Sequence, residues 1–117
     1  MNILIVSPSF GTFGGCEAFV FRLADEIAAS SHPVSICFKR VAGAFSLDET
    51  LQSYIDASPA QVTFVDRASR ALYREIRAAD VVHCQNPSID VALLAKWAGT
   101  PLVMTLHGWL RQRWTPR

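Results

Sequence analysis

The sequence lacks a marked excess of either charge. Its 11 Lys and Arg residues face 10 Asp and Glu residues, which leaves a formal net charge of +1 at pH 7. Nucleic-acid-binding domains draw much of their affinity from cationic side chains that neutralise phosphates. The charge balance offers no such argument, and we expect no nucleic-acid partner.

Cysteines are few and widely spaced. Cys16, Cys37 and Cys84 form no C-x-x-C pair, and their number is odd. This pattern argues against a disulfide framework and against a zinc site. We therefore expect no metal and no resident cofactor, in a chain that works in a reducing, cytoplasmic environment.

Long apolar runs are also missing. The apolar run after Met1 is too short for a signal peptide and has no basic segment before it. No stretch approaches the length of a membrane span. We expect a soluble protein. Arg111, Arg113 and Trp114 keep open a peripheral contact with the inner face of the membrane, although a severed chain end explains them more simply.

What the sequence does contain is a regular alternation of short apolar runs and helical patterns. Half of its 117 residues are hydrophobic, enough for one compact domain. The predicted strands cover residues 3–6, 34–38, 62–65, 81–84 and 102–106, and the predicted helices cover 16–30, 46–55, 69–78 and 88–98. The alternation predicts an α/β fold, a doubly wound, Rossmann-like parallel sheet of about five strands in the order 3-2-1-4-5.

Periodicity and end signals add detail to the helices. Spacings of three and four predict apolar stripes, and particular residue types predict where helices begin and end. Ser46 and Glu49 form a capping box, and Gly99 suits a helix C-terminus. The predicted stripes are Phe19, Val20, Leu23 and Ile27 in the first helix, Leu72 and Ile76, facing inward, in the third, and Ile89, Leu93 and Trp97 in the fourth.

In open parallel sheets, ligands bind beyond the carboxyl ends of the strands, where the strand order reverses. Here that crevice lies between the first and fourth strands. Three loops border it, at residues 9–17, 85–88 and 107–109. Their side chains are the candidates for a functional site.

The first loop ends in Gly14 and Gly15, directly before a helix. Paired glycines let backbone approach a ligand and adopt positive φ, and a helix N-terminus attracts anions, so the pair suits a phosphate. A tight turn without a ligand is the equal alternative, because the spacing does not meet G-x-G-x-x-G. We call the loop that ends in Gly14 and Gly15 the glycine loop. Glu17 either complements the helix dipole or hydrogen-bonds to a hydroxylated ligand or to the glycine loop.

The other two loops offer His107 and a run of polar residues. His107 precedes Gly108 at the rim of the crevice, where it can donate to a hydroxyl or phosphate or act as a base. Asn86 follows the fourth strand, where an amide can read sugar hydroxyls or serve an ordinary turn. We interpret His83 as a buried, hydrogen-bonded histidine, and Cys16 as a small hydrophobic residue rather than a nucleophile.

Four segments in register resemble glycosyltransferase family 4. The opening strand and Phe13-Gly14-Gly15-Cys16-Glu17 look like the family's strand and G-G-x-E loop. Ser31-His32-Pro33-Val34 looks like its G-H-x-V turn, with Ser in place of Gly. Residues 80–85 resemble D-(V/I)-(V/I)-H-x-H, with a Gln at the second His, and residues 99–108 resemble G-x-P-x-V-x-T-x-H-G.

The resemblance implies the GT-B architecture, in which two Rossmann-like domains face a cleft and a sugar moves from a nucleotide-sugar donor to an acceptor. The acceptor is a glycan, a lipid or a small molecule. Such transfer is retaining and needs no metal. By the match, His107 is the catalytic candidate near the transfer point. Gly14 and Gly15 approach donor diphosphate or acceptor, Glu17 supports their loop, and Asn86 and Gly108 are further substrate-binding candidates.

The resemblance covers only the N-terminal, acceptor-side domain. No second domain and no E-x7-E segment occurs within residues 1–117, so we expect a truncated domain without activity by itself. Two alternatives stay open. One is a non-catalytic, flavodoxin-like binding or regulatory module, and the other is a different GT-B enzyme such as a nucleotide-sugar epimerase.

Overall fold

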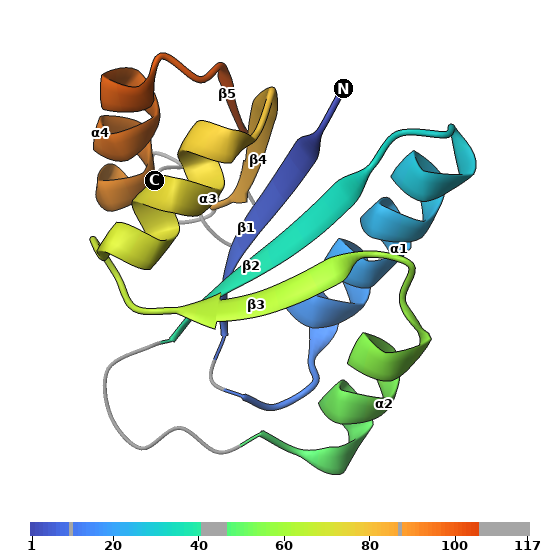
Figure 1. Ribbon diagram of the computed structural model, residues 1–117. Helices are drawn as coiled ribbons and strands as arrows, with labels where there is room; N and C mark the ends of the chain where they lie inside the picture. The colour runs from blue at the N-terminus through green and yellow to red at the C-terminus, as the bar shows by residue number, and fades with distance from the viewer. Residues whose placement is uncertain (10, 41–46, 87, 106–117) are drawn as a thin grey trace, which may run out of the picture.

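Strands and helices alternate along the whole described part of the chain (Figure 1). The computed structural model describes residues 1–9, 11–40, 47–86 and 88–105. The strands are β1 Ile3–Ser9, β2 Val34–Arg40, β3 Gln61–Val65, β4 Val81–Gln85 and β5 Leu102–Thr105. The helices are α1 Gly15–Ala29, α2 Glu49–Ala57, α3 Arg70–Ala78 and α4 Ile89–Ala98.

The five strands form one sheet in the order β3-β2-β1-β4-β5, with every pairing parallel. This confirms the predicted α/β class, strand order and Rossmann-like winding. β1 lies in the middle, where Ile3 pairs with Val34 of β2 on one side and with Val81 of β4 on the other. The order reverses between β1 and β4, so the loops after these strands meet at one edge of the sheet.

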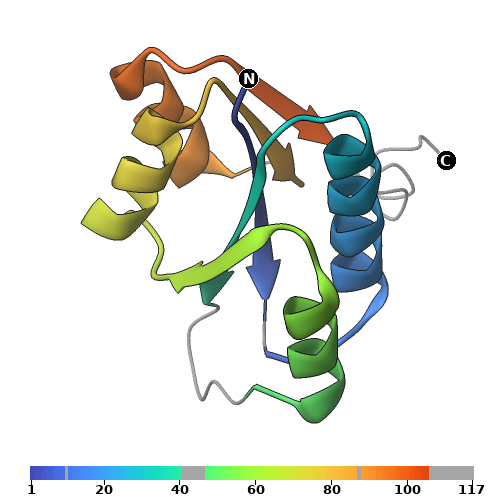
Figure 2. The same cartoon turned by 45° about the vertical axis from the view of Figure 1, so that its right-hand side comes forward.

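Helices cover both faces of the sheet, with α1 and α2 on one face and α3 and α4 on the other (Figures 1 and 2). Successive side chains of a strand point to opposite faces. Leu4 and Val6 accordingly join the core under α3 and α4, whereas Ile5 joins the core under α1 and α2. The continuous apolar runs of the central strands reflect burial on both faces.

Two strands are longer than their apolar runs predicted. β1 continues through Ser9 and β2 through Arg40, because Ser7, Pro8 and Ser9 pair with residues 38–40 of the neighbouring strand. The predicted strand ends at Val6 and Phe38 were therefore wrong. Ladder pairing carries these strands past their apolar runs into polar residues at the carboxyl edge, several of them buried.

Three helix predictions need correction. In α1, Phe19 of the predicted stripe is exposed, while Val20, Phe21 and Ala24 are buried. At α2 the N-cap is Asp48, whose carboxylate accepts the Leu51 N–H at 2.7 Å. Ser46 of the predicted capping box lies outside the described residues.

The third correction concerns α4, whose apolar stripe is exposed. Val91 and Ala95 are buried against the sheet instead. Both sides of α4 are apolar, and the smaller side chains of Val91 and Ala95 allow the helix to lie close to the strands.

Leu72 and Ile76 of α3 are buried as predicted. Gly99 ends α4 with φ 73°, which confirms the predicted cap. Among the described helices, none combines the length and apolar character that crossing a membrane requires.

Candidate functional site

Gly14 and Gly15 open α1 at the carboxyl edge of the sheet. Gly14 is the N-cap, with an extended backbone at φ −146°, and Gly15 is the first helical residue. The expectation that this pair adopts positive φ was wrong. Gly11 is the residue of this loop in the left-handed region, at φ 91°, where glycine is needed to turn the chain out of β1.

The fold does not require glycine at positions 14 and 15. A Cβ on Gly15 would meet no atom within 4 Å, and one on Gly14 would lie 3.4 Å from the Glu17 carboxylate, which is ordinary contact. Glycine in a helix also costs about 0.5–1 kcal/mol relative to alanine. The missing side chains leave the backbone of the first turn of α1 open to an approaching ligand.

Hydrogen bonds that involve Glu17, Ser9 and Asp48 hold this loop in place. Glu17 is buried, and its carboxylate accepts a hydrogen bond from the Ser9 hydroxyl at 3.3 Å. The same hydroxyl accepts the Gly11 N–H at 3.1 Å. On the other side, the Asp48 carboxylate accepts the Phe13 N–H at 3.1 Å. Glu17 thus lies where it can support the glycine loop, and its side chain is engaged with the protein.

At the end of β4, Gln85 is almost completely buried, with 1 % of its surface exposed. Its side-chain Oε1 and Nε2 have no hydrogen-bond partner in the part of the chain that the structure describes. Burying an amide without partners is costly. Asn86, the predicted binding residue, follows at φ 64° and donates its N–H to the Thr105 carbonyl at 2.7 Å.

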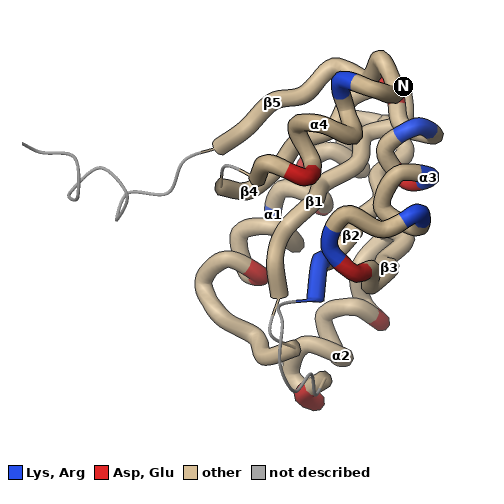
Figure 3. The backbone as a smooth tube through the Cα atoms, turned by 90° about the vertical axis from the view of Figure 1, so that its left-hand side faces the viewer, with Lys and Arg blue, Asp and Glu red and all other residues tan. Residues whose placement is uncertain are grey.

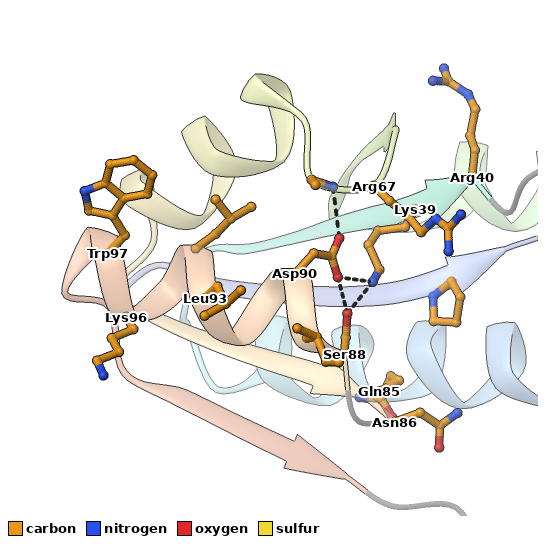
Figure 4. A pocket seen from close by; sticks show the side chains of 14 residues that line it. Lys39, Arg40, Arg67, Gln85, Asn86, Ser88, Asp90, Leu93, Lys96 and Trp97 are labelled. Carbon is orange, nitrogen blue, oxygen red and sulfur yellow. Dashed lines mark hydrogen bonds and ion pairs between the residues drawn. The ribbon is translucent and has the colours of Figure 1, made fainter.

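A groove of about 1410 Å³ runs from this edge along α4 (Figure 4). We call it the α4 groove. Asn86 lines it, but Gly14, Gly15 and Glu17 do not. The structure therefore separates the glycine loop from the α4 groove. The α4 groove is lined by Pro8, Lys39, Arg40, Arg67, Ala68, Gln85, Asn86, Ser88, Ile89, Asp90, Leu93, Leu94, Lys96 and Trp97.

A buried ion pair forms the floor of the α4 groove. Lys39 Nζ lies 2.9 Å from Asp90 Oδ1, and the two side chains expose only 8 % and 16 % of their surfaces. Ser88 donates to Asp90 and accepts from Lys39. Its hydroxyl therefore accepts no N–H from the first turn of α4, although Ser88 occupies the N-cap position. The other Asp90 oxygen accepts the Ala68 N–H at 3.0 Å.

This cluster lowers the pKa of Asp90 to about 2. Burial alone would raise it, but hydrogen bonds from Ser88, Lys39 and the Ala68 N–H, together with the Lys39 charge, outweigh burial. Sequence reasoning missed the cluster because it ended the second strand before Lys39. A lysine directly after an apolar run was the available signal, since a buried lysine needs a partner.

The three cysteines are free thiols. Cys16 lies 3.3 Å from the Ser7 hydroxyl. Burial raises the pKa of Cys37 and of Cys84 to about 11, so both thiols stay protonated near neutral pH. Within the described ranges, no group of three His, Cys, Asp or Glu side chains could hold a metal ion.

His83 is half-buried rather than buried. Its Nε2 contacts the Thr105 hydroxyl, and burial lowers the pKa of His83. His107 and Gly108, the predicted residues of the third loop, lie outside the described residues. The structure thus places the glycine loop, Glu17 and Asn86, and leaves the predicted catalytic position unplaced.

Comparison with known families accounts for most of the chain. Among curated proteins, no sequence matches it. The profile of Glycosyltransferase Family 4 matches residues 13–117, which include the glycine loop and every element from α1 to β5. This match supports a function of the glycosyltransferase type. The chain belongs to Glycosyltransferase Family 4.

Proposed function

We propose that this chain is the acceptor-side, N-terminal domain of a retaining GT-B glycosyltransferase. The enzyme transfers a sugar from a nucleotide-sugar donor to a glycan, lipid or small-molecule acceptor and uses no bound metal. A second Rossmann-like domain carries most of the donor site. The family match over residues 13–117 is the observation that carries this proposal.

The glycine loop supports the proposal through its shape. Its backbone is tied down by Glu17, Ser9 and Asp48, while the position that a Gly15 side chain would take is open, with no atom within 4 Å. A helix N-terminus offers free N–H groups and a partial positive charge to an anion. In our proposal, Gly14 and Gly15 approach the donor diphosphate or the acceptor at this point.

Transfer breaks the bond between the anomeric carbon and the donor diphosphate and forms a bond to an acceptor hydroxyl oxygen, whose proton passes to the departing diphosphate. Negative charge develops on the departing diphosphate, and preorganised donors stabilise it. In our proposal the second domain supplies most of these donors. His107, followed by Gly108, hydrogen-bonds the reacting sugar groups near the transfer point.

Gln85 and Asn86 are proposed to read acceptor hydroxyls. The Gln85 amide offers two donor hydrogens and one acceptor oxygen, and these groups have no partner among the described residues. Because the Gln85 side chain is almost completely buried, an acceptor hydroxyl would reach these groups only after the side chains that cover them move. A site built to hydrogen-bond a hydroxyl discriminates strongly against a substrate that lacks it.

The test uses the complete protein encoded by the reading frame that carries this chain. Release of nucleoside diphosphate from a panel of nucleotide sugars is measured with and without an acceptor mixture. We expect release to depend on acceptor. Gly15→Ala should lower kcat/KM without lowering the melting temperature, because its new methyl group meets no protein atom. Glu26→Gln, exposed further along α1, serves as the matched control.

Other outcomes separate the alternatives. Donor turnover that needs no acceptor would replace the proposal with an epimerase. Nucleotide binding without turnover would point to a regulatory module. Full activity of the Gly15→Ala protein would show that no ligand approaches the first turn of α1, and it would remove the glycine loop from the site.

A further inference from the structure

Exposed charge is divided between the two faces of the molecule. Every exposed charged side chain on α3 and α4 is cationic, whereas those on α1 and α2 are mostly acidic. Figure 3 shows the basic positions along α3. The cationic side chains are Arg70, Arg74, Arg77 and Lys96, and the opposite set consists of Asp25, Glu26, Glu49, Asp56 and Arg22.

The acidic residues of α3 and α4 do not offset this charge at the surface. Glu75 is half-buried and accepts a hydrogen bond from the Thr63 hydroxyl at 3.3 Å. Asp90 is engaged by Lys39. The outer side of the α3 and α4 layer therefore presents net positive charge, in a chain whose overall net charge is only +1.

The same layer exposes the apolar stripe of α4. Ile89, Leu93 and Trp97 have 80 %, 62 % and 82 % of their surfaces exposed. Single exposed apolar residues are common, but three large ones in a line form a patch that indicates an interaction surface. Tryptophan is enriched where an apolar phase meets water, because its ring is apolar and its N–H is polar.

The cationic and apolar residues point away from the sheet together. The arginines of α3 are spaced by four and three, on the side opposite the buried Leu72 and Ile76. The stripe of α4 lies opposite the buried Val91 and Ala95. The two helices are neighbours, because the rings of Tyr73 and Trp97 lie 6.2 Å apart.

We infer that this surface, the α3–α4 face, docks on an anionic membrane. It consists of Arg70, Arg74, Arg77, Ile89, Leu93, Lys96 and Trp97. The cations would contact lipid phosphates, and the stripe would enter the boundary between headgroups and acyl chains. A nucleic acid would leave the stripe exposed to water. The inference goes beyond the proposed function and does not use the glycine loop. Ile89, Leu93, Lys96 and Trp97 also line the α4 groove, so the α3–α4 face adjoins the proposed acceptor contacts at Gln85 and Asn86.

Vesicle binding tests the inference on the 117-residue chain. Co-sedimentation with vesicles of phosphatidylglycerol and phosphatidylcholine is compared with pure phosphatidylcholine vesicles. We expect binding only to the anionic vesicles, weakening as salt is added. The double variant Arg70→Gln and Arg74→Gln should reduce partitioning about 30-fold, at about five-fold per cation. Arg22→Gln, on the acidic α1 side, should leave partitioning unchanged.

A second measurement reads insertion directly. With Trp109 and Trp114 replaced by Phe, Trp97 is the remaining tryptophan. Lipids brominated in their acyl chains should quench its fluorescence. Leu93→Gln should lower partitioning about ten-fold, because an inserted leucine loses its apolar contact. Leu93→Ile should bind like the parent chain.

Three results would overturn the inference. The first is no association with anionic vesicles. The second is binding that disappears in Arg111→Gln with Arg113→Gln but survives the α3 variants, which would assign the contact to the last residues of the chain. The third is vesicle binding without quenching of Trp97, which would show that the α4 stripe does not enter the bilayer.

Discussion

Lys39 is a charged residue held inside the protein by a single carboxylate. It lies at the carboxyl end of β2 and meets Asp90, 51 residues later in the chain. The pair joins the end of β2 to the first turn of α4, and Asp90 also binds the Ala68 N–H. Removing one partner of a buried ion pair leaves the other charge without compensation.

Asp90→Ala should therefore destabilise the protein by about 3 kcal/mol, measured as the change in unfolding free energy in urea. The matched control is Asp66→Ala. Asp66 pairs with Arg40 at 3.3 Å, but its side chain is 75 % exposed. Its loss should cost about 0.5 kcal/mol or less. Equal losses of unfolding free energy in the two variants would show that the buried ion pair stabilises the fold no more than the exposed pair does.

The pKa of Asp90 predicts a specific acid dependence. Because the folded pKa is about 2 and the ordinary value is 3.8, the ionised carboxylate stabilises the folded state above pH 4. That contribution, about 2 kcal/mol, disappears as the pH falls from 4 to 2. The difference in stability between the parent chain and Asp90→Asn should shrink across this window. A difference that stays constant from pH 6 to pH 2 would contradict the lowered pKa.

The buried amide of Gln85 predicts that removing it stabilises the free protein. Gln85→Met removes buried polar atoms that have no partner among the described residues, so the free protein should gain about 1 kcal/mol of stability. Gln52→Met, at an exposed position of α2, should change stability by about 0.5 kcal/mol at most. A loss of stability in Gln85→Met would show that the amide is already hydrogen-bonded in the folded protein.

At the scale of elements, one side chain links α2 to the glycine loop. Asp48 caps α2 through the Leu51 N–H and also accepts the Phe13 N–H of the loop. Its own N–H donates to the Gly11 carbonyl at 2.8 Å. The beginning of α2 and the path of the loop therefore depend on each other, although 35 residues separate Phe13 from Asp48.

Asp48→Ala should cost about 2 kcal/mol, about 1 kcal/mol for the helix cap and a similar amount for the second hydrogen bond. Ser69→Ala is the control, because Ser69 caps α3 through the Leu72 N–H at 3.2 Å and does not bind the glycine loop. It should cost about 1 kcal/mol. Hydrogen exchange should accelerate at the Phe13 amide in Asp48→Ala only. Unchanged exchange there would disprove the link.

At the scale of the whole molecule, the proposed function predicts that these 117 residues do not catalyse sugar transfer by themselves. The resemblance assigns most donor contacts to a second domain, and these residues hold no E-x7-E segment. We expect no release of nucleoside diphosphate from any nucleotide sugar, with or without acceptor. Transfer at a measurable rate by the isolated chain would show that its own residues stabilise the departing diphosphate.

Local patterns in the sequence were enough to predict the helices and strands and the order of the strands in the sheet. Apolar runs of strand length alternate with helical patterns, and short connections between parallel strands leave few topologies. The predicted order 3-2-1-4-5 and the cap at Gly99 were therefore confirmed. The motifs around Gly14 and Glu17 likewise indicate the family without tertiary information, because local spacing is enough to recognise them.

Features that depend on partners distant in the chain could not be predicted from local patterns and are visible only in the folded arrangement. α4 is apolar on two sides, and its period cannot tell which side the sheet will bury; packing chose Val91 and Ala95 and left Trp97 outside. The partner of Lys39 lies 51 residues away, beyond any local pattern. Burial and pairing are properties of the assembled layers, since they arise when strands and helices separated in sequence come into contact.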